Sequence, residues 1–595
     1  MTMTTLLSSR FISLRFVHRT PCVFTSHCWQ ASLSTQTSSA HEASRNTAAE
    51  TVTPVFQHAL KFSDRVALKD RHGTYTYQGL FNSSNEFARQ ISESISGRVQ
   101  ERIAFLCHND ASYAITQWAC WMSGQIAVPL TSQHPPALQE YYIRNCEASV
   151  LVTTADFVDV VEPLATKTNA KLLVLDEALR RQAMAPTPGT QISLFESGLS
   201  PEFYRDSDAL IIYTSGTTGA PKGVVISHKN IQAQVSSLTE AWGWSQDDAI
   251  LHVLPLHHIH GIVNVLLCSQ ASGARCVMLP KFDASVVWNH LLGKNVSNNE
   301  EINVFMAVPT IYVKLLEEYE RMVAKDPSLQ EHVYNTCSQK IRLMVSGSAP
   351  LPAPLFKRWE DVTGHKLLER FGMSETGMVL SNPLNGERKP GFVGTPLPGM
   401  EVQITRPGSE SKYEILVHSS AAAGTTVLSK ETTTGDLLVR GPNVFNGYWK
   451  MPEATKKEFT DECWFKTGDT AQYAEGAFKI LGRSSVDIIK TGGYKVSALE
   501  IETHLLGHPD IIDCAVVGLP DNTWGQKVAV VIVTRGGKNI ILLQLREWCK
   551  KRMALYAIPT MAKIVESIPK NALGKTNKKE LIKKMFPETV KSQLD

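Results

Sequence analysis

The sequence predicts an α/β protein with a large domain followed by a smaller one. From about residue 51 short apolar runs alternate with helical patterns, which indicates strands and helices in alternation. After Pro390 the pattern changes to short strands punctuated by glycine and proline. A second boundary falls near Gly482 and Arg483, and the unit beyond it has roughly 110 residues, a usual domain size. With 595 residues the chain is also too long for a single core.

Composition narrows the class of protein. Charged residues make up 20% and hydrophobic residues 43% of the chain, as in soluble globular proteins. Lys and Arg number 60 against 57 Asp and Glu, which is too even a balance for a nucleic-acid binder with a basic face. No apolar stretch approaches the length of a transmembrane helix. The 11 cysteines are scattered without metal-site spacing, which predicts reduced thiols in an intracellular protein.

The first 45 residues have the composition of a mitochondrial transit peptide. Residues 1–41 contain no Asp or Glu and carry Arg10, Arg15 and Arg19 among apolar and hydroxyl residues. A secretory signal fits less well because arginine and serine interrupt the apolar run, and a disordered tail is the remaining alternative. We therefore expect residues 1–45 to be recognised by the import machinery, delivered to the matrix and removed before Thr51.

The predicted elements follow in chain order. Residues 102–107 and 126–130 read as strands around a helix at 113–123, which predicts βαβ units and a mostly parallel sheet. Further strands are expected at residues 149–153, 171–175, 275–279, 304–308 and 341–345. Residues 435–441 are typical of an antiparallel, barrel-like part. The smaller unit shows strand and helix signals at residues 490–496, 499–506, 514–518, 528–533 and 542–553.

A loop rich in glycine and hydroxyl groups follows the predicted strand at residues 208–213. It contains Thr214, Ser215, Gly216, Thr217, Thr218, Gly219 and Lys222. Free backbone N–H groups, hydroxyls and one ammonium suit a polyphosphate. The loop is not a Walker A motif, because Gly223 follows Lys222 where that motif has Ser or Thr. Composition alone would favour a flexible surface loop, but the lysine and the order of residues favour phosphate binding.

This loop and five later segments resemble the adenylate-forming superfamily, which includes acyl-CoA synthetases, luciferases and peptide-synthetase adenylation domains. The later segments are residues 347–351, 370–376, 464–469, 482–495 and 569–575. The resemblance implies a large AMP-binding domain at 46–482, with parallel-sheet subdomains and a small barrel-like part. It also implies a smaller mobile α+β lid domain at 483–595.

The resemblance implies roles for individual residues. The β- and γ-phosphates of ATP are expected at the loop residues Thr214 to Gly219 and Lys222. Adenine and the α-phosphate are expected at Gly347, Ser348, Ala349, Arg370, Phe371, Gly372 and Ser374. Asp469 and Arg483 are expected to hold the ribose, and Glu375 with Thr217 to hold Mg²⁺. Coenzyme A is expected at the loop of Lys490, Gly492 and Gly493.

Lys575 is the expected catalytic lysine. Beside Lys570, Lys578 and Lys579 it would ordinarily belong to a solvated basic face, but the preceding Pro-x-x-x-x-Gly matches the motif of the superfamily. The superfamily rotates its small domain after adenylation, which replaces this lysine with the loop for the thiol acceptor. The segment between Arg483 and Gly492 is one residue longer than is common, so the hinge is Ser485 or Val486.

Charged residues near the expected acid pocket favour a dicarboxylic acid. Arg370 precedes the adenine-stacking ring, Arg388 follows a short loop later, and His258 lies in the acid-pocket motif. A buried cation there is costly unless it meets a second anion, and arginine binds a carboxylate through two parallel hydrogen bonds. Each arginine alone could be a surface ion pair or a phosphate contact, and His258 and His260 could be packing residues.

Together these segments resemble malonyl-CoA synthetases, which implies malonate, with methylmalonate also accepted, as the acid. No carrier domain follows Asp595, so free coenzyme A is the expected acceptor. A medium-chain acyl-CoA synthetase is the first alternative. A peptide-synthetase-like adenylation domain is the second. The third is a nucleotide-binding regulator that has lost catalysis, although Lys222, Glu375 and Lys575 are all present.

Overall fold

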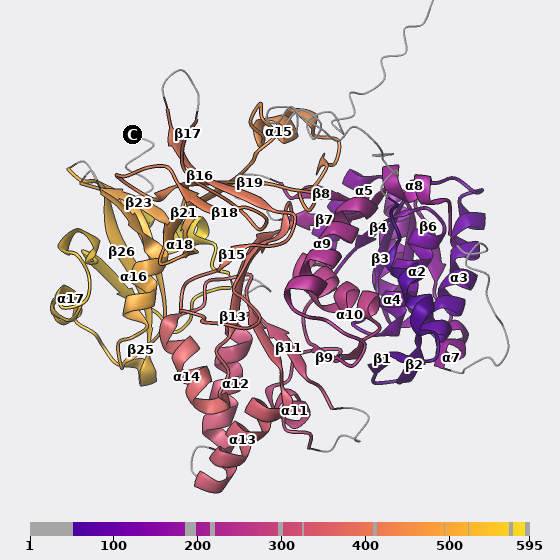
Figure 1. Cartoon of the computed structure of the whole chain (residues 1–595), viewed down its shortest axis with the longest axis horizontal. Helices are drawn as coiled ribbons and strands as arrows, with labels where there is room; N and C mark the ends of the chain where they lie inside the picture. Colours follow the sequence, from indigo (N-terminus) through magenta and orange to yellow (C-terminus); the bar gives the residue numbers. More distant parts are fainter. Residues whose placement is uncertain are drawn as a thin grey trace, which may run out of the picture. The chain divides into compact units, whose positions relative to one another are not determined.

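The computed structural model describes residues 51–184, 198–214, 220–294, 301–323, 326–408, 413–492, 494–521, 523–570 and 575–588. Within them, the first sheet has seven strands (Figure 1). In spatial order they are β20 (Gly447–Tyr448), β8 (Lys222–Ser227), β7 (Asp208–Thr214), β4 (Ile126–Pro129), β3 (Arg102–Leu106), β5 (Ala148–Thr153) and β6 (Lys171–Val174). The five strands from β7 to β6 are parallel as predicted, whereas β8 pairs antiparallel with both β7 and β20. Helices near this sheet include α4 (Ala111–Met122), α5 (Pro136–Cys146), α6 (Val158–Thr168), α8 (Pro201–Asp206) and α9 (His228–Ala241). Helices α3 (Tyr77–Ser94) and α7 (Glu177–Met184) pack on α4 and on edge strands of the second sheet.

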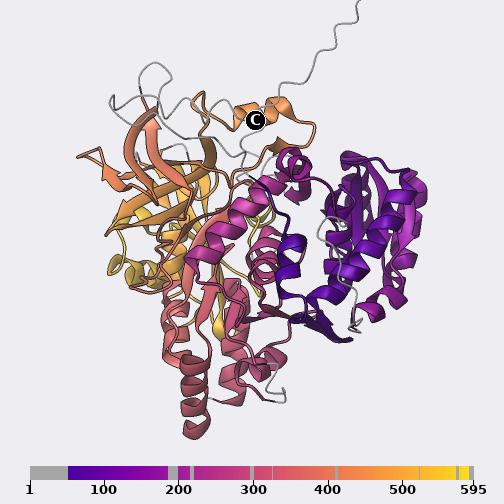
Figure 2. The same ribbon diagram turned by 45° about the vertical axis from the view of Figure 1, so that its right-hand side comes forward.

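The second sheet has nine strands and is parallel in its centre. Its order is β15 (Thr395–Pro396), β14 (Gly377–Ser381), β13 (Leu368–Met373), β12 (Leu343–Ser346), β11 (Val304–Ala307), β9 (Ala249–His252), β10 (Arg275–Met278), β1 (Val66–Asp70) and β2 (Gly73–Thr76). Helices α10 (Cys268–Ser272), α11 (Ala284–Leu291), α12 (Pro309–Met322), α13 (Pro327–Lys340) and α14 (Ala353–Thr363) accompany it, and the last three run side by side (Figure 2).

The third sheet is antiparallel, which confirms the change of pattern after Pro390. Its strands are β18 (Gly424–Val427), β17 (Tyr413–Ser420), β16 (Glu401–Pro407), β19 (Thr434–Arg440), β21 (Phe465–Ala474) and β22 (Ala477–Arg483). The short helix α15 (Pro452–Lys457) lies in the connection between β20 and β21. The last strand, β22, ends at Arg483, where the sequence places the domain boundary.

The smaller C-terminal domain contains a sheet of its own. Strands β24 (Tyr494–Ser497), β23 (Ile488–Thr491), β26 (Gly525–Thr534) and β25 (Ile511–Asp521) pair in that order, and β27 (Met561–Ile564) joins β26. Helices α16 (Ala498–Leu505), α17 (Leu542–Lys550) and α18 (Lys578–Met585) belong to this part. The strand expected at residues 490–496 is instead a hairpin, because Gly492 adopts a left-handed φ of 56° and reverses the chain.

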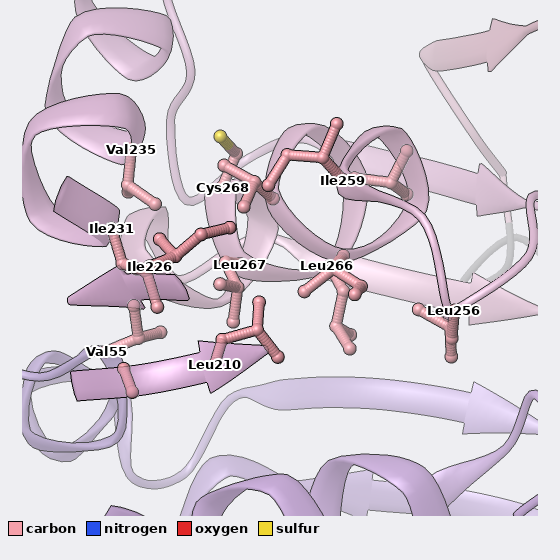
Figure 3. Close-up of a cluster of buried hydrophobic side chains, with 14 of the residues drawn as sticks. Val55, Leu210, Ile226, Ile231, Val235, Leu256, Ile259, Leu266, Leu267 and Cys268 are labelled. Carbon is pink, nitrogen blue, oxygen red and sulfur yellow. The ribbon is translucent and has the colours of Figure 1, made fainter. Parts of the chain in front are cut away.

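A buried apolar cluster supports the segment that carries the histidines (Figure 3). Residues 260–267 form a π-helix that runs directly into α10. Its Leu266 and Leu267 pack with Leu210 of β7, Ile226 of β8 and side chains of α9, and Val55 of α2 (Val55–Ala59) joins them. Burying each such side chain contributes about 1.5–3 kcal/mol, so the cluster fixes this segment firmly. None of the described helices is long and apolar enough to cross a membrane.

Candidate active site

The expected phosphate-binding residues flank the turn between β7 and β8. Thr214 ends β7 and pairs with Lys222, which begins β8. The Lys222 ammonium lies 4.4 Å from the centre of the Tyr448 ring and 3.7 Å from Oε1 of Glu458. An aromatic face and a carboxylate therefore hold the lysine at the mouth of the turn. The remaining loop residues, Ser215, Gly216, Thr217, Thr218 and Gly219, lie outside the described residues.

The hairpin of β13 and β14 carries the expected residues for adenine, the α-phosphate and the metal ion. Phe371, Gly372 and Ser374 are half-buried, whereas Glu375 is buried. Gly372 sits at a bulge where a Cβ atom would approach the carbonyl oxygen of Gly377 to 2.2 Å. Only glycine permits this close passage of the two strands.

Tyr448 contacts both Lys222 and Glu375, and the sequence analysis did not identify it. Its hydroxyl donates a hydrogen bond of 3.1 Å to Oε1 of Glu375, while its ring lies under Lys222. Burial raises the pKa of Glu375, and the Tyr448 hydrogen bond and the nearby Arg483 act in the opposite direction. The sequence gives no local signal for this role, because Tyr448 lies in a two-residue strand, β20, whose partner β8 is far away in the chain. No group of three or more His, Cys, Asp or Glu side chains at metal-binding distance occurs in the described part of the chain.

Asp469, Arg483 and Lys575 meet where the large and small domains join. Asp469 and Arg483 are direct partners across β21 and β22, and Oδ1 of Asp469 lies 3.2 Å from Nε of Arg483. The Lys575 side chain is exposed at the surface, but the surrounding protein atoms partly desolvate its ammonium. This desolvation, together with the Arg483 cation, lowers its pKa, while Asp469 and Glu375 oppose the change. The structure thus brings Lys575 within electrostatic range of both the expected ribose contacts and the expected metal ligand.

Arg370 is a buried cation on β13 with 4% of its surface exposed. Among the described residues it forms no ion pair, its Nε has no hydrogen-bond partner, and Nη2 donates a long 3.4 Å hydrogen bond to Oγ of Ser348. Burial lowers the pKa of Arg370 to about 9. Gly347 makes room for the guanidinium, since a Cβ atom there would lie 2.5 Å from its central carbon.

Ser348 connects Arg370 to the histidine segment. Its Oγ lies 3.2 Å from Nδ1 of His260, and its backbone adopts a left-handed φ of 69°, which is strained for a residue with a side chain. Ala349 follows it in the same connection between β12 and α14. The expected adenine-side residues therefore also contact the expected acid-binding arginine.

Four histidines approach one another near Arg370 and Lys575. The rings of His257 and His258 are 4.1 Å apart, and His134 lies 5.5 Å from His257. Burial lowers the pKa of His257 to about 2 and that of His258 to about 4, and it also lowers the pKa of His260. All three imidazoles of the motif are therefore neutral near pH 7, so they offer hydrogen bonds rather than charge.

Arg388 is placed differently from Arg370. Its guanidinium donates hydrogen bonds to the backbone carbonyls of Lys366, at 2.7 Å, Pro383, at 3.0 Å, and Leu384. Within the described residues no contact joins it to Arg370 or His258, so its substrate role remains a prediction.

The expected coenzyme A loop lies in the smaller domain. Lys490 and Gly492 are exposed in the hairpin of β23 and β24, where Gly492 N–H donates to the carbonyl of Trp524. Gly493 lies outside the described residues.

Comparisons with known proteins identify the family of this chain. The AMP-binding enzyme family matches residues 55–449, and the AMP-binding enzyme C-terminal domain matches residues 500–575. The mitochondrial malonate–CoA ligase ACSF3 of Mus musculus is 48% identical over 91% of this chain and 92% of its own length. The crystal structure of ATP-bound MatB from Rhodopseudomonas palustris has a TM-score of 0.74 and 29% identity over 90% of this chain and all of that chain. A malonyl-CoA ligase in a ternary product complex with methylmalonyl-CoA and AMP has a TM-score of 0.57 and 29% identity over 86% of this chain and 97% of that chain. The chain therefore belongs to the AMP-binding enzyme family.

Proposed function

We propose that the protein is an acid–thiol ligase that joins malonate to coenzyme A with ATP, giving malonyl-CoA, AMP and diphosphate. Family membership and 48% identity to a malonate–CoA ligase support the reaction class. Methylmalonate is the proposed second substrate, because one added methyl group changes binding modestly where charge determines specificity.

The observation that carries the choice of acid is the environment of Arg370. A buried guanidinium without an anionic partner among the described residues is costly in the free protein. A malonate molecule that presents one carboxylate to ATP presents the other to this cation, which binds it through two parallel hydrogen bonds. The neutral imidazole of His258 supplies a further polar contact. A medium-chain fatty acid, by contrast, would leave the Arg370 charge unpaired.

In the first step a carboxylate oxygen of malonate attacks the α-phosphorus of ATP, and diphosphate leaves. Both reactants are anions, so the site must supply fixed positive charge. Lys222 and the loop from Thr214 to Gly219 hold the β- and γ-phosphates, while Ser374 holds the α-phosphate. Lys575 bridges the malonate carboxylate and the α-phosphate. Glu375 and Thr217 would hold Mg²⁺, which would supply charge to neutralise phosphate oxygens, and the single buried carboxylate of Glu375 suits this ion.

The nucleoside is held by residues on three strands and one connection. Phe371 stacks on adenine beside Gly372, with Gly347, Ser348 and Ala349 along the same edge. Asp469 accepts hydrogen bonds from the ribose hydroxyls, and Arg483 is the second ribose contact.

In the second step the sulfur of coenzyme A attacks the acyl carbon, and AMP leaves with the bonding electrons. Rotation of the small domain removes Lys575 and brings in the loop of Lys490, Gly492 and Gly493. The proposed domains are 46–482 and 483–595, with the hinge at Ser485 or Val486. Residues 1–45 are the proposed transit peptide, which the import machinery carries to the mitochondrial matrix.

A substrate panel tests the function. Purified protein is given ATP, Mg²⁺ and coenzyme A with malonate, methylmalonate, succinate or octanoate, and AMP release and acyl-CoA are measured. We expect malonate to give the highest kcat/KM, followed by methylmalonate. Preference for octanoate would identify a medium-chain acyl-CoA synthetase and refute the dicarboxylate argument.

A further inference from the structure

Helix α18 begins with a buried lysine between two carboxylates. Nζ of Lys578 lies 2.6 Å from Oδ1 of Asp487 and 2.8 Å from Oε1 of Glu502. The residue is 9% exposed, so it does not belong to the solvated basic face that the neighbouring lysines suggest. Burial alone would lower the pKa of Lys578, but the two carboxylates outweigh it and raise the pKa. The lysine is therefore a cation that ties together three separate segments.

The second oxygen of Asp487 closes the turn between the two domains. Oδ2 of Asp487 accepts a 3.1 Å hydrogen bond from the backbone N–H of Arg483, and the Arg483 carbonyl accepts from Asp487 N–H at 2.8 Å. Gly482 allows this closure, because a Cβ atom there would lie 2.4 Å from Cβ of Asp487. Ser485 and Val486, the two candidate hinge residues, lie inside the closed turn.

A series of contacts connects Lys578, through Asp487 and Arg483, to the residues around Lys575. Arg483 leaves the turn to pair with Asp469 at 3.2 Å, and both act electrostatically on Lys575. Lys575 precedes Lys578 by three residues, a length of chain that spans at most about 10 Å. In the segment 575–578, Lys578 is therefore anchored to the hinge turn through Asp487. Lys575, at the other end, lies within electrostatic range of the Asp469–Arg483 pair, and Arg483 belongs to the same turn.

We propose that Lys578 is a positioning residue for the adenylation step. Through its ion pair with Asp487, it fixes the segment that carries Lys575 to the closed hinge turn. The inference depends on the proposed role of Lys575. A shift of about 1 Å in a reacting group can reduce a rate about 100-fold, so loss of the anchor affects the step that uses Lys575. Thioester formation, which does not use Lys575, is spared.

The experiment separates the two half-reactions in the full-length protein. Malonate-dependent exchange of diphosphate into ATP measures adenylation, and release of AMP from supplied malonyl adenylate with coenzyme A measures thioester formation. Lys578→Met should slow exchange about tenfold or more with an unchanged KM for ATP and unchanged thioester formation. Lys578→Arg, which keeps the charge, should restore most of the exchange rate. Lys583→Met on the exposed face of α18 is the matched control.

Removal of the lysine alone leaves two buried carboxylates without a cation, which can unfold the domain. The double variant Lys578→Met with Glu502→Gln removes one of these charges and leaves Asp487 bonded to the Arg483 amide. It should show the same selective loss of exchange. Equal loss of both half-reactions, no loss of exchange, or loss of the fold in both variants would overturn the inference. Failure of the proposed function is recognised separately, because the unmodified protein would then show no malonate-dependent exchange.

Discussion

The hydroxyl of Tyr448 donates a 3.1 Å hydrogen bond to the buried carboxylate of Glu375. The same tyrosine presents its ring to Lys222, so one side chain holds both an anion and a cation that the proposed mechanism needs.

Tyr448→Phe should impair adenylation most at low pH. The Tyr448 hydrogen bond counteracts the effect of burial on Glu375, so its loss raises the pKa of Glu375 further. A raised pKa means that the carboxylate of Glu375, the proposed ligand of Mg²⁺, protonates at a higher pH, so activity should fall earlier on acidification. We expect the acid limb of the pH–rate profile to move upward and the Mg²⁺ requirement to increase about 5- to 10-fold. Tyr473→Phe is the control, and identical profiles for both variants would contradict the prediction.

Arg370→Met should raise the melting temperature of the substrate-free protein and weaken malonate binding. The substitution removes a buried charge that has no counter-ion among the described residues, and methionine fills similar space. We expect the KM for malonate to rise about tenfold or more with an unchanged KM for ATP. A selective ATP defect would make Arg370 a nucleotide ligand instead.

Arg388→Ala tests the second arginine that the sequence singles out. The dicarboxylate hypothesis predicts a higher KM for malonate with little effect on ATP. Since the Arg388 guanidinium is bonded to three backbone carbonyls, we expect a smaller malonate effect than at Arg370 and a lower melting temperature. Kinetics and thermal denaturation measure the two effects, and a malonate KM like that of the unmodified protein would remove Arg388 from the substrate contacts.

Lys575→Ala should abolish adenylation and leave thioester formation from supplied malonyl adenylate intact. Loss of a fixed charge at the developing transition state lowers the rate about 100-fold or more. Lys570→Ala is a suitable control on the same segment, because the Lys570 ammonium pairs with Asp513 at 2.7 Å. Equal loss in both steps would refute the assignment of Lys575 to adenylation alone.

Glu369→Gln should flatten the pH dependence of stability. Glu369 is buried on β13, where it accepts the N–H of Gly391, and burial raises its pKa to about 8. Because the folded protein binds this carboxyl proton more tightly than the unfolded chain, protonated Glu369 contributes stability that is fully present below pH 4.5. This contribution is lost as the pH rises from about 4.5, the ordinary pKa, through about 8, the pKa in the folded protein. Melting temperatures between pH 5 and 9 should therefore fall less in the variant. The exposed Glu317→Gln should behave like the unmodified protein.

Local patterns predicted much of the fold. The alternation around residues 102–130 reflects buried parallel strands and a buried helix, and the structure has β3, α4 and β4 there. The hairpin at Gly492 was missed because the strand signal of residues 490–496 was given more weight than the Gly492-Gly493 pair, although two consecutive glycines favour a turn and Gly492 adopts a left-handed φ.

The site was harder to predict where it depends on tertiary contacts. Motif order predicts roles for Lys222, Glu375 and Asp469, since each lies in a recognisable segment, and these roles stay predictions. Tyr448 and Lys578 carry no local signal, because their partners come from strands and turns far away in the chain. For Arg388, the short distance in sequence from the acid-pocket motif suggested a contact with the substrate carboxylate. In the structure its guanidinium instead donates hydrogen bonds to backbone carbonyls, among them that of Lys366.

Arg370, a buried cation without an ion-pair partner among the described residues, also links the stability of the protein in the cell to the supply of its proposed substrate. A ligand that binds only the native state stabilises it by mass action, and the gain grows with the concentration of the ligand. Ample dicarboxylate would therefore protect the chain from proteases, while scarcity would shorten its half-life, so that enzyme abundance follows supply without any dedicated sensor.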